Sequence, residues 1–442
     1  MTNKPYVKIG AAVVAALGVT WLGTTWYGGQ QIMKQYPEAL AKISDSQLGA
    51  MKFVITKQEA GFFTSHVNWD LIITPNPCAP NGTFKISGYD DIRHGLVPSL
   101  GFGQVQSHII WPERAKPFLT KMFGEKEPLK ITTNIGLFGT LTTKVSSPVA
   151  MYTDEKGTLD WKGLSSSISR SYDEKQSETD IEFAGVQLKN TQKNFVLQLD
   201  KVGYESDLAQ GASGLGLGEG KLSLKGLNVE TDGKTFGFKT LVIHSDASEK
   251  DGFFAVNLNS KVESFVQDGQ NIGKFDMVFN VDHIDAKALK NVNDLVKKLR
   301  SECKPNFDGL MQAAQPIFAK GVNATLKNAD IELFDGKAHA EGKVNLPSLS
   351  AAEVQDPKQA LLKLEIDGKA DFTDKLISAI VKTMLEKSSQ GQPVDPQLQA
   401  QVVAQMLAKP LSEGLIVKTA DGYTSNFQVR QGKSIVNGKS LN

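Results

Sequence analysis

Strict alternation of apolar and polar residues is the feature that most constrains the fold of this chain. The clearest run places Phe275, Met277, Phe279 and Val281 on one side of the backbone. Comparable runs occur at 195–199, 221–225, 254–258, 337–346, 362–367 and 423–430. Because successive side chains of a strand point to opposite faces, this period predicts antiparallel strands with one face buried.

Turn dipeptides separate these runs. Asp-Gly and Asn-Gly tolerate the positive φ angles of tight hairpins, so each predicts a connection between neighbouring strands. The expected turns are Asp232-Gly233, Asp251-Gly252, Asp268-Gly269, Asp335-Gly336, Asp367-Gly368, Asp421-Gly422 and Asn437-Gly438. So many in one chain indicate a meander of antiparallel strands instead of a parallel βαβ sheet.

Helical spacing interrupts the strands in a few places. Asp285 precedes a helix over 286–300, and Asp395-Pro396 supplies an N-cap and a first-turn proline for another. Apolar spacing after Thr373 predicts a helix over 374–385. A shorter helix is expected after Trp111-Pro112. The segment 28–50 is expected to be helical, with a disturbance at Pro37.

The N-terminus carries a long apolar segment. Ile9–Tyr27 contains no charged residue and would be about 28 Å long as a helix, close to the ~30 Å of a bilayer core. Lys4 and Lys8 precede it, which by the positive-inside rule keeps the N-terminus cytoplasmic. The segment therefore predicts an uncleaved membrane anchor. The alternative is a cleaved signal peptide, for which Ala16-Leu17-Gly18 is the only tolerable site.

These patterns together predict an α+β fold: an N-terminal transmembrane helix, then an extended, mostly antiparallel β body with a few inserted amphipathic helices. The expected organisation is a cytoplasmic tail at 1–8, a transmembrane anchor at 9–27, a helical linker at 28–50 and a strand-rich periplasmic body at 51–442. A division of that body near residue 190 is left open. The expected location is the bacterial inner membrane, crossed once.

Catalytic and cofactor motifs are missing from the sequence. The six histidines, at positions 66, 94, 108, 244, 283 and 339, include no helical ligand pair and no HExxH. The glycine-rich block at 211–218 runs into strand residues instead of a helix, so it predicts a bend and not a phosphate loop. A formal charge of +1 excludes a strongly basic nucleic-acid binder. We therefore expect no catalytic, cofactor or metal residue and no nucleic-acid partner.

Two cysteines suggest one covalent link. Cys78 lies in a proline-rich loop and Cys303 lies just past the predicted helix at 286–300. In an oxidising compartment two such loop thiols favour a disulfide. Two unpaired thiols are the open alternative.

A ridge of small residues lies within the apolar N-terminal segment. Ala12, Ala16, Thr20 and Thr24 recur every four residues, a spacing that lets two membrane helices approach closely. This predicts a helix-dimer face and a homodimer. The alternative is that small residues merely fill this segment without a partner.

Several short motifs, in this order, resemble the YdgA/YihF-type bacterial envelope proteins, whose domain is of unknown function. They are Glu59–Ser65, Ile92–Pro98, Gly214–Leu227, Val281–Leu289 and Val436–Lys439. The second is similar to a His-Gly-Pro motif of that family, although Leu96 stands where the family usually has proline. The resemblance implies an inner-membrane anchor, a periplasmic body and a homodimer. It implies no known catalytic residue, and it favours a structural role for His94.

The function expected from the sequence is that of a non-enzymatic envelope protein. It would act as a binder or scaffold, with a lipid-like or hydrophobic molecule as the candidate ligand, and without a cofactor. One alternative is a protein–protein assembly factor that recruits an envelope partner through a strand edge. A second alternative is an enzyme whose site is scattered across the fold.

Overall fold

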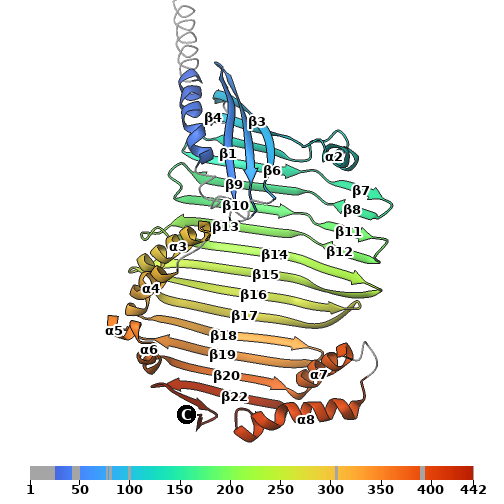
Figure 1. Ribbon diagram of the computed structural model, residues 1–442, viewed down its shortest axis with the longest axis vertical. Coiled ribbons are helices and arrows are strands. Elements are labelled where there is room, and N and C mark those ends of the chain that lie inside the picture. The colour runs from blue at the N-terminus through green and yellow to red at the C-terminus, as the bar shows by residue number, and fades with distance from the viewer. Residues whose placement is uncertain are drawn as a thin grey trace, which may run out of the picture. The chain divides into compact units, whose positions relative to one another are not determined.

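The computed structural model describes residues 25–41, 50–75, 78, 82–97, 101–303, 307–388 and 394–441. Strands dominate this part of the chain, and every strand pair whose register is given is antiparallel. Within each unit most strands pair with the next strand in the sequence, the arrangement of a meander (Figure 1).

The predicted fold class is wrong. The described residues form mostly antiparallel β sheet, and 56% of them are in strands and 24% in helices. Across the described ranges, no helix is both long and apolar enough to cross a membrane. Of the expected transmembrane segment, residues 9–24 lie outside the described residues, and 25–27 begin a helix that runs to 41 and includes charged residues such as Lys34 and Glu38. The first described strand begins at Met51, well before the first clear alternating run at 195–199.

Two compact units divide the chain. The first comprises residues up to 152, 160–183 and 296–306, and the second comprises 153–159, 184–295 and 307–442. The division between 183 and 184 lies near the expected one at 190. Residues 296–306 belong to the first unit although the residues before them belong to the second, and no feature of the local sequence predicts this.

The first unit is built from a helix at residues 25–41 and an antiparallel sheet. Its neighbouring strands run in the order β1 (Met51–Ala60), β2 (Thr64–Ile73), β3 (Phe84–Val97), β4 (Gly101–Ile110), β5 (Lys130–Ile135), β6 (Thr140–Ser147), β9 (Leu164–Ser171) and β10 (Gln176–Phe183). The short helix α2 (Lys116–Phe123) follows Trp111-Pro112 as predicted. The hairpin of β7 (Ala150–Asp154) and β8 (Gly157–Trp161) has its tip in the second unit.

The core of the first unit lies between the helix at 25–41 and the sheet. Met33 of the helix packs with Val67, Ile92 and Val105, which come from β2, β3 and β4. The helix buries positions 25, 29 and 33, a spacing of four that keeps one face against the sheet.

The second unit is a broad antiparallel sheet in which long strands pair in sequence order. It comprises β11 (Val186–Asn190), β12 (Phe195–Leu199), β13 (Val202–Gln210), β14 (Gly216–Thr231), β15 (Lys234–Lys250), β16 (Phe253–Gln267), β17 (Gln270–Asp285), β18 (Val322–Leu333), β19 (Gly336–Leu346), β20 (Glu365–Thr373), β21 (Val417–Lys418), β22 (Gly422–Arg430), β23 (Lys433–Val436) and β24 (Lys439–Ser440). β14 pairs with β13 along its first half and with β12 along its second half.

Most of the predicted hairpin turns are confirmed. Both residues of Asp232-Gly233, Asp251-Gly252, Asp268-Gly269 and Asn437-Gly438 have positive φ, as a type I′ turn requires. Asp421-Gly422 lies in the turn between β21 and β22, where the Thr419 N–H donates to the Gly422 carbonyl oxygen at 2.8 Å. The turn before β19 is Phe334-Asp335, one residue earlier than the predicted Asp335-Gly336. One predicted turn is wrong, because Asp367-Gly368 lies inside β20.

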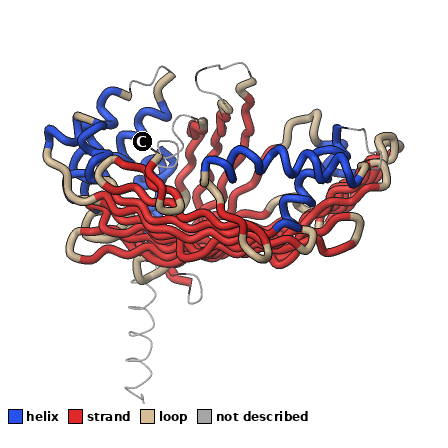
Figure 2. The backbone as a smooth tube through the Cα atoms, turned by 90° about the horizontal axis from the view of Figure 1, so that it is seen from below, coloured by secondary structure: helices blue, strands red, loops and turns tan. Residues whose placement is uncertain are grey.

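The second unit also carries the inserted helices: α3 (Ala286–Ser301, whose last residues belong to the first unit), α4 (Asp308–Lys320), α5 (Ala351–Gln355), α6 (Pro357–Lys363), α7 (Asp374–Ser388) and α8 (Pro396–Glu413). The predicted caps are confirmed: Asp285 accepts from the Ala288 N–H, and Asp395 accepts from the Gln397 N–H. Figure 1 shows α4–α6 at one end of the strands and α7 and α8 at the other, and Figure 2 shows helices on one side of the strands.

Candidate functional site

The two faces of the second unit's sheet differ sharply in chemistry. On one face a row of ionisable side chains crosses five strands in register: Lys261, Asp276, Asp330, His339 and Asp371. A second row lies two residues further along the strands: Lys274, Glu332 and Lys337. Alternate residues share a face, so both rows point to the same side.

A groove of about 660 Å³ lies between these two rows. Its floor is the backbone of Phe275, Ile331, Ala338 and Phe372, whose side chains point to the opposite face. The charges of the walls are largely paired with each other. His339 Nδ1 lies 2.7 Å from Asp330 Oδ1, and Lys274 Nζ lies 3.3 Å from Glu332 Oε1.

The Asp330 carboxylate is held in its ionised form by this pairing. The hydrogen bond from His339 is the main cause that lowers the pKa of Asp330, and Asn328 adds a second hydrogen bond. Both partners are substantially exposed to solvent, so the pair adds little to stability. The groove is therefore a solvated, self-neutralised surface.

The opposite face of the same sheet is apolar. One end of it is covered: Phe372 and Tyr423 pack against Ile377 and Val381 of α7 and Leu407 of α8. The next two rows toward the middle of the strands are only partly covered, because all ten of their residues remain partly exposed. The rows are Met277–Ala329–Ala340–Ala370–Ser425 and Phe279–Leu326–Gly342–Gly368–Phe427.

We call these ten positions the apolar lane. The side chains in its middle are small, because these positions are Ala340, Ala370, Gly342 and Gly368. Larger apolar side chains flank this stretch. The lane crosses β17, β18, β19, β20 and β22, and four inter-strand spacings of about 4.8 Å give it a length of roughly 19 Å. The arrangement can hold an extended apolar chain lying across the strands.

A second feature lies in the core of the first unit. Asp90 and His94 of β3 are 4% and 6% exposed, and the helix at 25–41 covers both. Tyr36 of that helix donates a hydrogen bond to Asp90 Oδ2. A Cβ atom on Gly29 would lie 2.2 Å from His94 Nδ1, so the helix backbone rests directly against the imidazole.

Burial shifts both groups away from their ordinary titration. It raises the pKa of Asp90 to about 6, with Ser107 and His108 opposing the shift. Burial also lowers the pKa of His94, with the backbone of Phe62 opposing it. Low-dielectric surroundings favour the uncharged form of each group.

Two of the short motifs noted in the sequence meet at this place. The backbone N–H of His94 donates to the Phe63 carbonyl oxygen at 2.8 Å, which joins the segment 59–65 to the segment 92–98. His94 lies within β3, not in a turn. Its contact with Gly29 explains why a small residue is needed on the helix, and the sequence pattern alone does not show that the helix is the partner.

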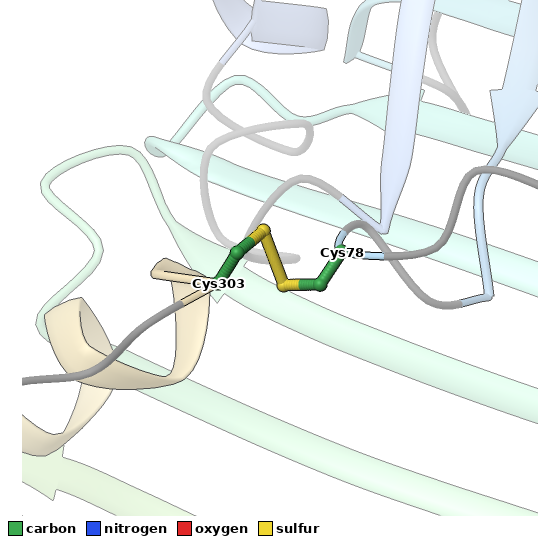
Figure 3. Close-up of a disulfide and its surroundings, with 2 residues drawn as sticks. All are labelled: Cys78 and Cys303. Atoms are coloured by element: carbon green, nitrogen blue, oxygen red, sulfur yellow. A yellow bond between two sulfur atoms is a disulfide. The ribbon is translucent and has the colours of Figure 1, made fainter.

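The predicted cysteine pair is bonded in the structure. Cys78 follows β2, Cys303 follows α3, and their Cα atoms are 5.0 Å apart (Figure 3). Both residues belong to the first unit, so the bond holds the segment 296–306 within it.

The proposed helix-dimer face of Ala12, Ala16, Thr20 and Thr24 lies outside the described residues. Within the described ranges, no group of three or more His, Cys, Asp or Glu residues has the geometry of a metal site. The glycine-rich block forms a turn at 211–214, where the Glu249 carboxylate accepts from Ser213, and then continues as β14.

Comparison with known proteins identifies the family. The profile described as "Bacterial protein of unknown function (DUF945)" matches residues 3–442. "Protein YdgA" of Escherichia coli (strain K12) is 23% identical over 317 residues, which cover 65% of this chain and 61% of that protein's length. No solved structure matches the chain. Since the profile covers nearly all of the sequence, the chain belongs to the DUF945 family of bacterial proteins.

Proposed function

We propose that this protein is a non-enzymatic binding protein of the bacterial envelope, whose second unit binds the acyl chain of a lipid-like ligand in the apolar lane. The observation that carries the proposal is the partial exposure of all ten lane positions on an otherwise apolar sheet face. Apolar surface that folding leaves in water favours association with an apolar ligand.

The shape of the lane supports a chain-like ligand. Helices cover Phe372 and Tyr423 at one end of the strands, while the rows beyond them stay open. Alanine and glycine at the floor leave room that Leu or Phe would fill. A bulky polar ligand would find no charged or hydrogen-bonding side chain among the ten lane positions except Ser425.

An oxidising compartment is part of the same proposal. Disulfides persist in the periplasm and are rare in the cytosol, so the Cys78–Cys303 bond supports an extracytoplasmic location. The charged groove on the other face supports binding less well, because its side chains already neutralise each other.

A binding measurement with a fluorescent long-chain fatty acid tests the proposal. Ala340 faces the lane and its neighbour Glu341 faces the polar side of β19, so the two positions form a matched pair. Ala340→Trp fills the floor of the lane and should weaken binding at least tenfold. Glu341→Trp adds the same side chain on the opposite face and should change binding less than twofold.

Three results would count against the proposal: no saturable binding by the wild-type chain, equal loss of binding in both variants, or full binding in both. If the protein instead purifies with a stoichiometric envelope protein and no lipid, the assembly function is the better account.

A further inference from the structure

Buried polar groups without partners gather at one interface of the first unit. Five side-chain atoms of the described residues are buried without a hydrogen-bond partner, and four of them lie here: Thr25 Oγ1, Asp90 Oδ1 and both ring nitrogens of His94. The fifth is Thr424 Oγ1 of β22. Thr25 is fully buried, and Asp90 and His94 are more than nine-tenths buried. A buried polar group without a partner destabilises the folded state, and the cost is much larger when the group is charged.

The three residues lie at the contact between the helix at 25–41 and β3. Thr25 contacts Gly95, because a Cβ atom on Gly95 would lie 2.7 Å from the Thr25 hydroxyl. Gly29 rests on His94, and Tyr36 bonds to Asp90. The helix therefore runs along β3, with its start over His94 and its later turns over Asp90.

Among the described residues, no Lys or Arg faces Asp90 from the strands beside it or from the helix. Tyr36 faces it from the helix, Val67 lies opposite on β2, and Ser107 lies opposite on β4. His108 of β4 and Asp91 of β3 itself are the charged neighbours, and they act in opposite directions. No Lys or Arg contributes to the balance at this carboxyl group.

His94 is also isolated from charge. The helix presents Thr25 and Gly29 to the His94–Gly95 segment, β4 presents Gly103, and the chain before β2 presents the backbone of Phe62 and Phe63. A proton gained by this imidazole would find no carboxylate among these groups.

We propose that the helix at residues 25–41 is a pH-sensitive latch, whose packing on β3 is most stable when Asp90 and His94 are both uncharged. This inference does not rest on the proposed lipid function. Acid weakens the packing of this helix by protonating His94, and a rise in pH weakens it by ionising Asp90.

The two groups give opposite pH dependence. Asp90 titrates at about 6 when covered, against 3.8 when exposed, so its contribution to seating is present at low pH and is lost as pH rises from 3.8 through 6. For that shift alone, the seating equilibrium falls about tenfold between pH 5 and pH 7. His94 has a lowered pKa when covered, so its contribution is present above pH ~6.5 and is lost as pH falls.

Amide hydrogen exchange of the full-length protein tests the latch. Protection of 25–41 is measured from pH 5 to pH 8 and corrected for the intrinsic pH dependence of exchange. His94→Gln leaves only the Asp90 titration, so protection should fall about tenfold from pH 5 to pH 7. Asp90→Asn leaves only His94, so protection should rise with pH over the same range.

Asp91→Asn is the matched control, because Asp91 is half-exposed and its side chain bonds to His66 on the outer face. It should shift the wild-type profile only slightly, because Asp91 is the smallest of the causes that act on the pKa of Asp90. Tyr36→Phe keeps both titrating groups but removes a hydrogen-bond donor to Asp90, so it should lower protection and move the Asp90 step to higher pH. Amides of β5 and β6 in the first unit report whether the sheet under the helix is folded in each variant.

The latch is refuted if Asp90→Asn and His94→Gln show the same pH profile. It is equally refuted if Asp91→Asn changes the profile as much as Asp90→Asn does.

Discussion

Two adjacent glycines lie in the helix at 25–41, and replacing each of them with alanine should have opposite effects on the stability of the docked helix. A Cβ atom on Gly29 would lie 2.2, 2.7 and 2.8 Å from three ring atoms of His94, whereas a Cβ atom on Gly28 would have no neighbour within 4 Å. Gly29→Ala therefore drives a methyl group into a buried ring, and Gly28→Ala adds one in open space.

The magnitudes follow from two competing effects. Alanine is more favourable than glycine in a helix by about 1 kcal/mol. Overpacking typically costs about 1–3 kcal/mol, and a buried ring met at three atoms places Gly29→Ala at the upper end of that range. We expect Gly29→Ala to destabilise helix docking by about 2 kcal/mol and Gly28→Ala to stabilise the helix by about 1 kcal/mol.

Amide exchange at 25–41 measures both effects directly. At about 1.4 kcal/mol per tenfold change, Gly29→Ala should lower protection roughly 30-fold and Gly28→Ala should raise it roughly fivefold. Combining Gly29→Ala with His94→Ala should cost less than the sum of the single changes, because the two positions touch. Equal protection of the two alanine variants would refute the seat of the helix on His94.

Two further predictions concern bonds that the structure contains. The protein should migrate faster without reductant than with it, Cys78→Ser or Cys303→Ser should abolish that difference, and complete alkylation of both thiols without reductant would contradict the bond. Asp285→Ala should destabilise the second unit by about 1–2 kcal/mol in urea unfolding, because it removes the N-cap of α3. Burial acts to raise the pKa of Asp285, but Lys320 and the Ala288 N–H outweigh it and hold the pKa below 3.8. Its contribution is therefore present above about pH 4 and lost in acid, and a variant with the wild-type acid dependence would contradict this role.

Local signals predict the second unit well. Alternation in Phe275–Val281 lies within β17, and the caps at Asp285 and Asp395 begin α3 and α8. These features depend on neighbouring residues, which the sequence displays directly. Hairpin turns are also readable, because positive φ restricts the residue choice.

Features that depend on distant residues are not predictable in this way. Asp90 lies in an Asp-Asp pair that resembles a solvated surface, yet Tyr36, 54 residues away, covers it. The helix α4 is hidden in the sequence because Pro316 lies within it. Strand β9 has the sequence LSSSISRS, in which the alternation is too weakly apolar to show. Gly368 suggests a turn, but it lies in a strand and forms part of the lane floor.

Photo-crosslinking with a diazirine-bearing long-chain fatty acid tests the central claim most directly, because it shows where an acyl chain lies. The lane predicts label on peptides from β17, β19 and β20, at or beside Met277, Ala340 and Ala370, and competition by unlabelled fatty acid. Label spread over the protein without competition, or concentrated outside these strands, would contradict the proposed binding function.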